Sequence, residues 1–440
     1  MPVTTARAPP GALSAVSAEL RPVQLAWLAA AVFVVSAGYG GLLPLLPGWL
    51  APLMPGAATA EIGRHVGFLS GIYAAGVLVG APFWGLVSDR AGRGRILIIG
   101  LVGYVASLLL LLVPGLAVVW GIYTLRGMTG FFVAAVVPVV SALVAEHTPE
   151  DRRARRFAWL SGMSLLGFLF GPGLTVVADW VGSWVGDGAS SPALSVRVVV
   201  VLSALLGGTM MVGLARTLPA PRAPDTAIQS NQATSSPTRT IALFWLNGAL
   251  LFVLAGFELG IVLLGQQQGG QSSRQAAIMF AECSLVMLAI NAVLFLTSLL
   301  EKISARILMG TGLIVAMVGL AMLAAHRSDA WMYLGVSFIS AGTGLVLPVI
   351  AYLAAGASRQ KLGATMGGLA AAAGFGQTLG SAAGGWLFGA VAQRSFDWLI
   401  LPLLVILSLL IFRPGWWSVT STTPALPAVR PSVKGRQARL

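Results

Sequence analysis

Long apolar runs alternate with short polar turns along most of the chain. Crossing a hydrocarbon core about 30 Å thick takes about 20 apolar residues in a helix, and the runs are near that length. A backbone in lipid has to satisfy its own hydrogen bonds, so the runs predict membrane-spanning helices. We expect an all-α polytopic membrane protein with twelve transmembrane helices in two six-helix bundles, at residues 25–46, 66–87, 96–113, 117–144, 157–178, 197–215, 241–264, 276–299, 306–325, 331–355, 363–391 and 397–412.

Three polar segments interrupt or flank this pattern. The longest internal one is rich in Pro, Ser, Asn and Gln, a composition typical of a flexible linker. It separates six runs from six, as two parallel repeats would require. We therefore expect a disordered tail at 1–20, a first bundle at 21–218, a cytoplasmic linker at 219–240, a second bundle at 241–413 and a disordered tail at 414–440.

Composition and charge placement favour a membrane protein over a nucleic-acid binder. The 440 residues are 57% hydrophobic and 9% charged, whereas soluble domains carry about 25% charged residues. The net charge is +13, but the basic residues lie between the apolar runs. Of the 27 Lys and Arg, 21 fall on one side of the predicted membrane, five on the other, and Arg126 lies within a run. The positive-inside bias then predicts a multi-pass protein of the inner (plasma) membrane with both termini cytoplasmic.

A basic, glycine-rich turn joins the second and third runs. It reads Gly85-Leu86-Val87-Ser88-Asp89-Arg90-Ala91-Gly92-Arg93-Gly94-Arg95. The pattern resembles the signature loop of the major facilitator superfamily, and the predicted topology extends the resemblance to most of the chain. The resemblance implies two bundles that rock about a central cavity, with a conformational latch formed by Gly85, Asp89, Arg90, Gly92 and Arg93.

The position of Asp89 gives the latch a physical basis. At the end of its own helix this carboxylate meets the negative pole of the helix dipole. A helix N-terminus is a favourable anion site, and the eleventh run begins on the same membrane face near residues 362–363. Asp89 docked there would tie the two bundles together. The alternative is a solvated carboxylate in a loop.

Three charged residues lie inside predicted spans and are candidates for proton coupling. Arg126, with Gly130 four residues later, resembles the family's fourth-span motif, which is linked to proton transfer. Its burial costs at least about 2.5–3.5 kcal/mol, so it needs a partner, a wet cavity or backbone carbonyls. Glu258 and Glu282 lie in the seventh and eighth runs. A carboxylate in a low-dielectric site takes up a proton more readily, as coupling requires. Glu282 has the alternative of lying near the outer surface.

Small residues recur in the fifth and eleventh runs. Gly167, Gly171 and Pro172 of the fifth resemble the antiporter motif of drug–proton exchangers, although Leu174 and Thr175 replace the family's last glycines. Gly376 and Gly380 are their counterparts in the eleventh. Small residues at this spacing allow close helix packing, which is also a sufficient explanation by itself.

The resemblance favours an exporter. We expect a secondary transporter that exports small amphiphilic compounds by alternating access in exchange for protons. Its partners are a small-molecule substrate, protons and the bilayer, and we expect a monomer without cofactor, metal or nucleic acid. Tyr39, Asn247 and Gln377 are candidates for lining the cavity. Further aromatic candidates are Tyr73, Trp245, Phe257 and Tyr352.

Two alternatives remain open. One is a metabolite importer or facilitator of the same superfamily. The other is a membrane-embedded enzyme or sensor. We favour a transporter over an enzyme because no cluster of His, Asp or Glu and no cofactor motif is visible in the sequence.

Overall fold

The computed structural model describes residues 20–116, 118–148, 150–185, 192–218, 237–267, 273–297, 303–325, 328–357 and 362–413. Regular structure in this part of the chain is helical throughout. The first half comprises α1 (Pro22–Leu42), η1 (Leu43–Leu45), α2 (Leu46–Leu50), η2 (Ala51–Leu53), α3 (Thr59–Ala91), α4 (Arg93–Leu110), α5 (Val119–Val133), α6 (Val137–Glu146), α7 (Glu150–Val185) and α8 (Pro192–Thr217). The second comprises α9 (Pro237–Gln267), α10 (Ser273–Leu296), α12 (Ala305–Ala325), α13 (Asp329–Ala357), α14 (Leu362–Val391), η3 (Ala392–Arg394) and α15 (Ser395–Phe412).

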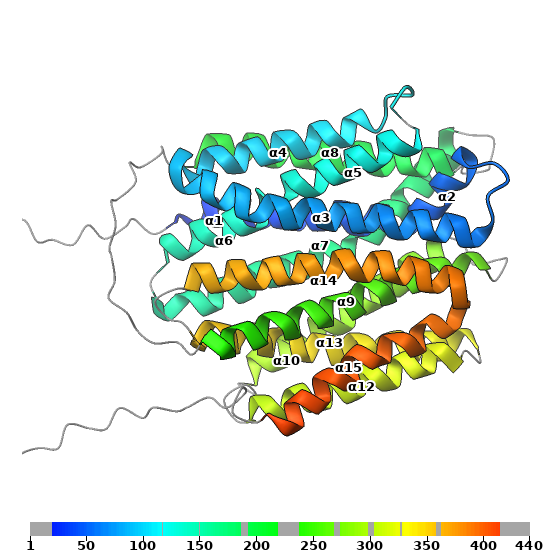
Figure 1. Ribbon diagram of the computed structural model, residues 1–440. Helices are drawn as coiled ribbons and strands as arrows, with labels where there is room; N and C mark the ends of the chain where they lie inside the picture. Colours follow the sequence, from blue (N-terminus) through cyan, green and yellow to red (C-terminus); the bar gives the residue numbers. More distant parts are fainter. Residues whose placement is uncertain are drawn as a thin grey trace, which may run out of the picture.

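The predicted spans correspond to these helices. Eleven helical stretches among the described residues are long and apolar enough to cross a membrane, and the last runs for 45 residues from Gly368 to Phe412. At 1.5 Å per residue that stretch would measure about 68 Å, about twice the hydrocarbon thickness. The chain turns back at η3, between α14 and α15 (Figure 1). These two helices are separate spans, which gives the expected twelve.

The boundaries differ from the expectation in three places. The first span continues through η1 and α2, where Pro44 and Pro47 each start a new helical segment. The fourth span is broken between α5 and α6, just before Pro138 at the start of α6. Helix α9 begins at Pro237, so the last four residues assigned to the linker are helical. Residues 1–19, 219–236 and 414–440 lie outside the described part of the chain.

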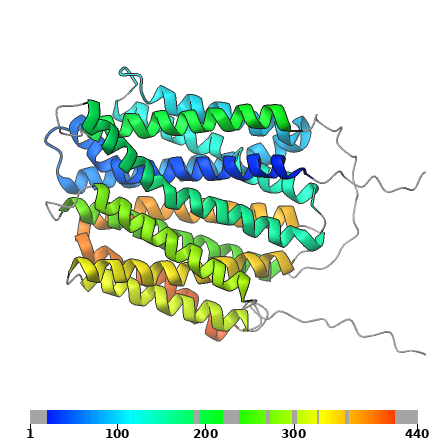
Figure 2. The same ribbon diagram turned by 180° about the vertical axis from the view of Figure 1, so that it is seen from behind.

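The helices lie roughly side by side in two groups (Figure 1). Helices α1–α8 form one group and α9–α15 the other. Two helix pairs join them: α3 packs against α14, and α7 packs against α10. Figure 2 shows the second pair from behind. The interior between the two groups is therefore bordered by four helices that each belong to an interface between the halves.

Glycines set the register of α3 against α14. A Cβ atom at Gly67 would lie 2.8 Å from the carbonyl oxygen of Ser381, and one at Gly374 would lie 3.4 Å from Leu78. The two helices thus run antiparallel, with positions 67 and 78 of α3 beside 381 and 374 of α14. Continuing this register brings the end of α3 toward the beginning of α14. The backbones approach closely because these positions lack a side chain.

One end of the molecule is much more basic than the other. The beginning of α1, the α3–α4 turn and the end of α8 lie at the same end, which we call the basic face (Figure 1). Its described arginines are Arg21, Arg90, Arg93, Arg95, Arg152, Arg156, Arg216, Arg306 and Arg413. The opposite end carries Arg64, Arg197 and Arg394 among the described side chains. The asymmetry that the sequence predicted is therefore present in three dimensions.

Candidate functional site

Three aromatic and polar contacts lead from Arg126 across the boundary between the halves. The Arg126 guanidinium of α5 lies over the ring of Tyr73 in α3, 4.8 Å from the ring centroid. Tyr73 stacks on Tyr39 of α1, with centroids 4.9 Å apart and planes at 29°. The amide Nε2 of Gln377 in α14 donates to the Tyr39 hydroxyl at 3.4 Å. Four helices, one of them from the second half, thus meet at this chain of contacts.

Arg126 is almost completely buried, with 1% of its surface exposed. Its Nε and Nη2 atoms have no hydrogen-bond partner among the described residues. The face of an aromatic ring carries partial negative charge and attracts a guanidinium, more strongly when water is excluded. Tyr73 therefore provides part of the stabilisation that a buried charge requires.

A narrow cavity adjoins this guanidinium. Its empty volume is about 180 Å³, and a water-sized sphere does not fit in it. Gly38 gives it space, because a Cβ atom there would overlap the hydroxyl of Tyr104. The lining side chains come from α1, α3, α4 and α5: Val35, Tyr39, Leu42, Tyr73, Tyr104, Leu108, Arg126 and Thr129. The cavity belongs to the first half alone.

Glu258 of α9 is the acidic residue that interacts electrostatically with Tyr39 of this cluster. Its side chain is buried, with 8% of its surface exposed. Within the part of the chain that the structure describes, it makes no hydrogen bond or ion pair. Tyr39 lies within electrostatic range of both Glu258 and Arg126. The two charged residues predicted from sequence, Arg126 of the first half and Glu258 of the second, therefore both lie within electrostatic range of Tyr39.

Glu282 has a different environment. It is half-buried in α10 and accepts a hydrogen bond from the hydroxyl of Ser337 in α13. Its second carboxylate oxygen is buried without a partner among the described residues. Since α13 belongs to the second half, this contact joins two helices of one half. Its role in coupling stays a prediction.

The candidate cavity residues divide into two kinds. Tyr39 and Gln377 contact each other between the halves. The amide of Asn247 in α9 instead donates to the backbone oxygen of Leu369 in α14, at 3.0 Å, and is buried there. Its donor is thus engaged in joining two helices. Trp245 is 70% exposed and lies on the outside of the bundle.

The glycines of the fifth and eleventh spans are packing positions. A Cβ atom at Gly167 or Gly171 of α7 would overlap the α1 backbone at Phe33 or Gly40. At Gly376 or Gly380 of α14 it would overlap the α9 backbone at Gly248 or Phe252. Pro172 lies inside α7, which continues through it as helix. Spans five and eleven therefore use equivalent glycines to pack on spans one and seven.

The basic turn between α3 and α4 holds an ion-pair cluster. Arg93 contacts Asp89 at 3.0 Å and Glu146 of α6 at 2.6 Å. Its Nη1 also donates to the Ser88 hydroxyl at 3.4 Å. Gly92 has φ of +92°, a conformation that residues with a Cβ atom rarely adopt, so glycine is needed between the helices. These contacts hold three helices of the first half together on the basic face.

The ion pair of Asp89 at the predicted latch lies within the first half. Asp89 has its ion pair with Arg93, and its side chain is 60% exposed. Arg90 is exposed, and a Cβ atom at Gly85 would meet no atom within 4 Å. The side chains of residues 362–364, where Asp89 is expected to dock, lie outside the described part. Docking of Asp89 on α14 stays a prediction.

Sequence reasoning did not single out Tyr104, Thr129 or Gly38 as neighbours of Arg126. Tyrosines and small residues occur throughout the spans, so their types alone give no signal. Only helix packing shows which of them share a level with the arginine. Among the described residues no group of His, Cys, Asp and Glu is placed to bind a metal ion.

A model of the Major Facilitator Superfamily matches residues 28–294, which is more than half of the chain. The chain belongs to this superfamily. Membership explains why two groups of six spans face each other and why equivalent spans pack through equivalent glycines. A superfamily member of this kind is a multi-pass membrane transporter.

The alignments with two curated relatives cover most of the length of each relative. Tetracycline resistance protein, class D, of Salmonella ordonez is 28% identical over 397 residues, covering 86% of this chain and 94% of that protein. Multidrug resistance protein 2 of Bacillus subtilis (strain 168) is 25% identical over 300 residues, covering 66% and 71%.

A solved structure shares the fold of this superfamily member. The crystal structure of the human organic anion transporter MFSD10 (TETRAN) has a TM-score of 0.68 with 17% sequence identity. The alignment covers 89% of this chain and 100% of that structure. At this identity the likeness shows the fold alone.

Proposed function

We propose that the protein exports small amphiphilic compounds across an inner (plasma) membrane in exchange for protons. The observation that carries the proposal is the contact chain of Arg126, Tyr73, Tyr39 and Gln377 between the halves. Glu258, which has no hydrogen bond or ion pair among the described residues, lies within electrostatic range of Tyr39. Aromatic faces suit apolar parts of a substrate. A buried acid that exchanges protons between two environments supplies the coupling. The relatives named for tetracycline and multidrug resistance support export.

Alternating access supplies the transport step. The two bundles, residues 21–218 and 241–413, would rock about the level of Tyr39, so that this level faces each side of the membrane in turn. Proton binding to Glu258 would bias the equilibrium through its different affinity in the two states. The ion pairs of Arg93 on the basic face, and docking of Asp89 against α14, would set how readily that face opens. We place the basic face, both termini and the linker in the cytoplasm, following the positive-inside bias.

The test is transport by purified protein in liposomes with an imposed pH gradient. The panel contains cationic, neutral and acidic amphiphiles of similar size. Accumulation that follows the gradient and disappears with a proton ionophore is the expected result. Equilibration of the substrate across the membrane without any effect of the pH gradient would show that the protein is a facilitator. If folded protein transports no compound of the panel, small amphiphilic compounds are excluded as its substrates.

A further inference from the structure

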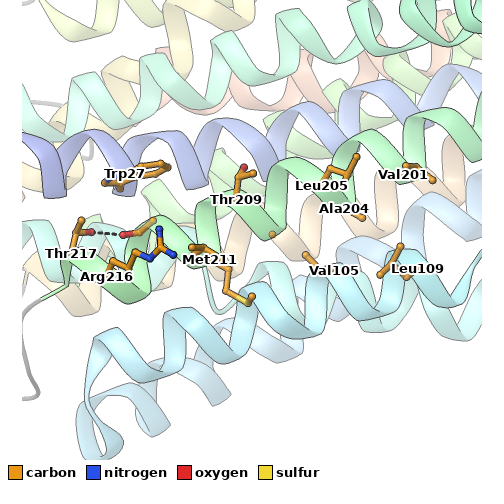
Figure 3. A pocket seen from close by; sticks show the side chains of 13 residues that line it. Trp27, Val105, Leu109, Val201, Ala204, Leu205, Thr209, Met211, Arg216 and Thr217 are labelled. Carbon is orange, nitrogen blue, oxygen red and sulfur yellow. Dashed lines mark hydrogen bonds between the residues drawn. The ribbon is translucent and has the colours of Figure 1, made fainter.

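A groove runs along the outside of the first half, between α1, α4 and α8. Figure 3 shows its side chains, which extend along α8 from Val201 to Arg216, with Trp27 on one side and Val105 and Leu109 on the other. The surface is almost entirely apolar. The side chains that complete it are Ala204, Leu205, Thr209, Met211, Val212 and Thr217.

The groove lies on the surface that faces lipid. Leu205 is 62% exposed, Leu109 45% and Val212 41%, and all three lie within apolar spans. From Val201 to Arg216 is fifteen residues, or about 22 Å along the helix. The hydrocarbon core is about 30 Å across two leaflets, so the groove can hold one whole acyl chain of one leaflet.

Its mouth on the basic face carries positive charge. Arg216 is exposed and has no hydrogen bond or ion pair among the described residues. A Cβ atom at Gly94 would lie 3.6 Å from Leu218. The first turn of α4, which contains Arg95, is therefore close to the end of α8. The first turns of α1 and α4 contain no acidic residue.

The acidic side chains described at the neighbouring α3–α4 turn and at the end of α6 do not cancel this charge. Asp89 and Glu146 are both paired with Arg93. The helix N-termini of α1 and α4 add partial positive charge at the same face. Basic pockets between transmembrane helices are known sites for anionic lipid head groups.

We propose that this groove binds an anionic phospholipid, with one acyl chain along α8 and the phosphate at Arg216. The apolar length matches an acyl chain, and the cation at its end matches a phosphate at the level of the head groups. A free anion would bind at Arg216 and leave the apolar part of the groove along α8 empty. A zwitterionic lipid would present the Arg216 side chain with less net negative charge.

The experiment measures lipid retained by the purified full-length protein in native mass spectrometry. Phosphatidylglycerol and phosphatidylcholine with identical chains are compared, together with glycerol phosphate as a head group without chains. We expect phosphatidylglycerol to be retained preferentially. Arg216→Gln should reduce its binding about fivefold, the value of one basic residue near a charged surface. Arg197→Gln is the matched control, because it removes an exposed arginine from the opposite end of the same helix.

A second variant tests the apolar part. A Cβ atom at Gly208 would meet no atom within 4 Å, so Gly208→Phe fills the groove without a clash, and Gly208→Ala leaves it open. Gly208→Phe should weaken retention of both lipids, and Gly208→Ala should not. Equal preference for phosphatidylglycerol in Arg216→Gln and Arg197→Gln would overturn the proposal. So would unchanged retention in Gly208→Phe, or equal binding of glycerol phosphate.

Discussion

Gly376 of α14 lies directly against the backbone of Gly248 in α9, with no room for a Cβ atom between them. The same relationship holds in the first half, where Gly171 of α7 lies against Gly40 of α1. Spans five and eleven are thus fixed to spans one and seven by backbone contact. Each bundle can move as a rigid body only while these contacts persist.

Gly376→Ala is expected to lower the free energy of unfolding by about 1–3 kcal/mol, the usual cost of adding a methyl group to a tightly packed site. The atom it meets is a backbone oxygen, which cannot move aside cheaply. Thermal unfolding of the purified protein measures the effect. Gly173→Ala is the control, since its Cβ atom would meet no atom within 4 Å. Equal melting temperatures for the two variants would contradict the packing role.

Substitution of Asp89 distinguishes a role as a latch between the halves from a role in a local ion pair. Asp89 and Glu146 both pair with Arg93, and both are well exposed, so each pair contributes at most about 1 kcal/mol to stability. Asp89→Asn should slow transport while leaving the protein in the membrane, because docking on α14 would be lost. Glu146→Gln removes the other carboxylate from Arg93 and serves as the control. Identical transport rates in the two variants would favour a local role for Asp89.

Sequence patterning predicted the spans well because a bilayer dictates the length and composition of each one. The charge asymmetry between the two ends was predictable because basic residues gather in the cytoplasmic turns of a membrane protein. The break before Pro138 and the extension of the first span through Pro44 and Pro47 depend on local backbone geometry, so their position was not predictable from hydropathy.

The candidate site was only partly accessible from the sequence. Arg126 and Glu258 were found because a charge inside an apolar run is costly and conspicuous. The contacts of Arg126 with Tyr73, and of Tyr39 with Gln377, join residues that are distant in sequence and follow from helix packing. Asn247 lies on the same face of α9 as Glu258. Its amide, however, donates to the backbone of α14, and this contact could not be predicted from the sequence of α9 alone.

The orientation in the membrane is tested by cysteine accessibility. The one native cysteine, Cys283, is buried and should give little background labelling. Ser235→Cys, in the linker, should react with an impermeant maleimide only after the membrane is opened. Gly115→Cys, in the turn at the opposite end, should react in intact cells. Labelling of Ser235→Cys from outside would reverse the proposed orientation.

The contact between Arg126 and Tyr73 predicts a difference between two substitutions. Tyr73→Phe keeps the aromatic face under the guanidinium, so transport and melting temperature should stay near their original values. Tyr73→Leu removes that face and should destabilise the protein by about 2 kcal/mol, the value of a desolvated cation–π contact. Thermal unfolding and transport in liposomes measure both variants. A similar loss in Tyr73→Phe would show that the hydroxyl, rather than the ring face, is required.

Glu258 is the residue on which proton coupling is predicted to depend. It is buried, it has no hydrogen-bond partner in the described chain, and it lies within electrostatic range of Tyr39 between the halves. Glu258→Gln mimics the protonated carboxyl group and cannot release a proton. Substrate exchange across the membrane should therefore persist, whereas accumulation driven by a pH gradient should fall to background.

Glu282→Gln is the matched comparison for this variant, since it removes a second intramembrane carboxylate that is bonded to Ser337 within one half. We expect it to retain gradient-driven accumulation, because its contact does not cross between the bundles. Both activities are measured in the same liposomes, with counterflow reporting exchange and an imposed pH gradient driving accumulation. Full accumulation by Glu258→Gln would make that residue structural. Loss of accumulation in Glu282→Gln alone would move the coupling site to α10.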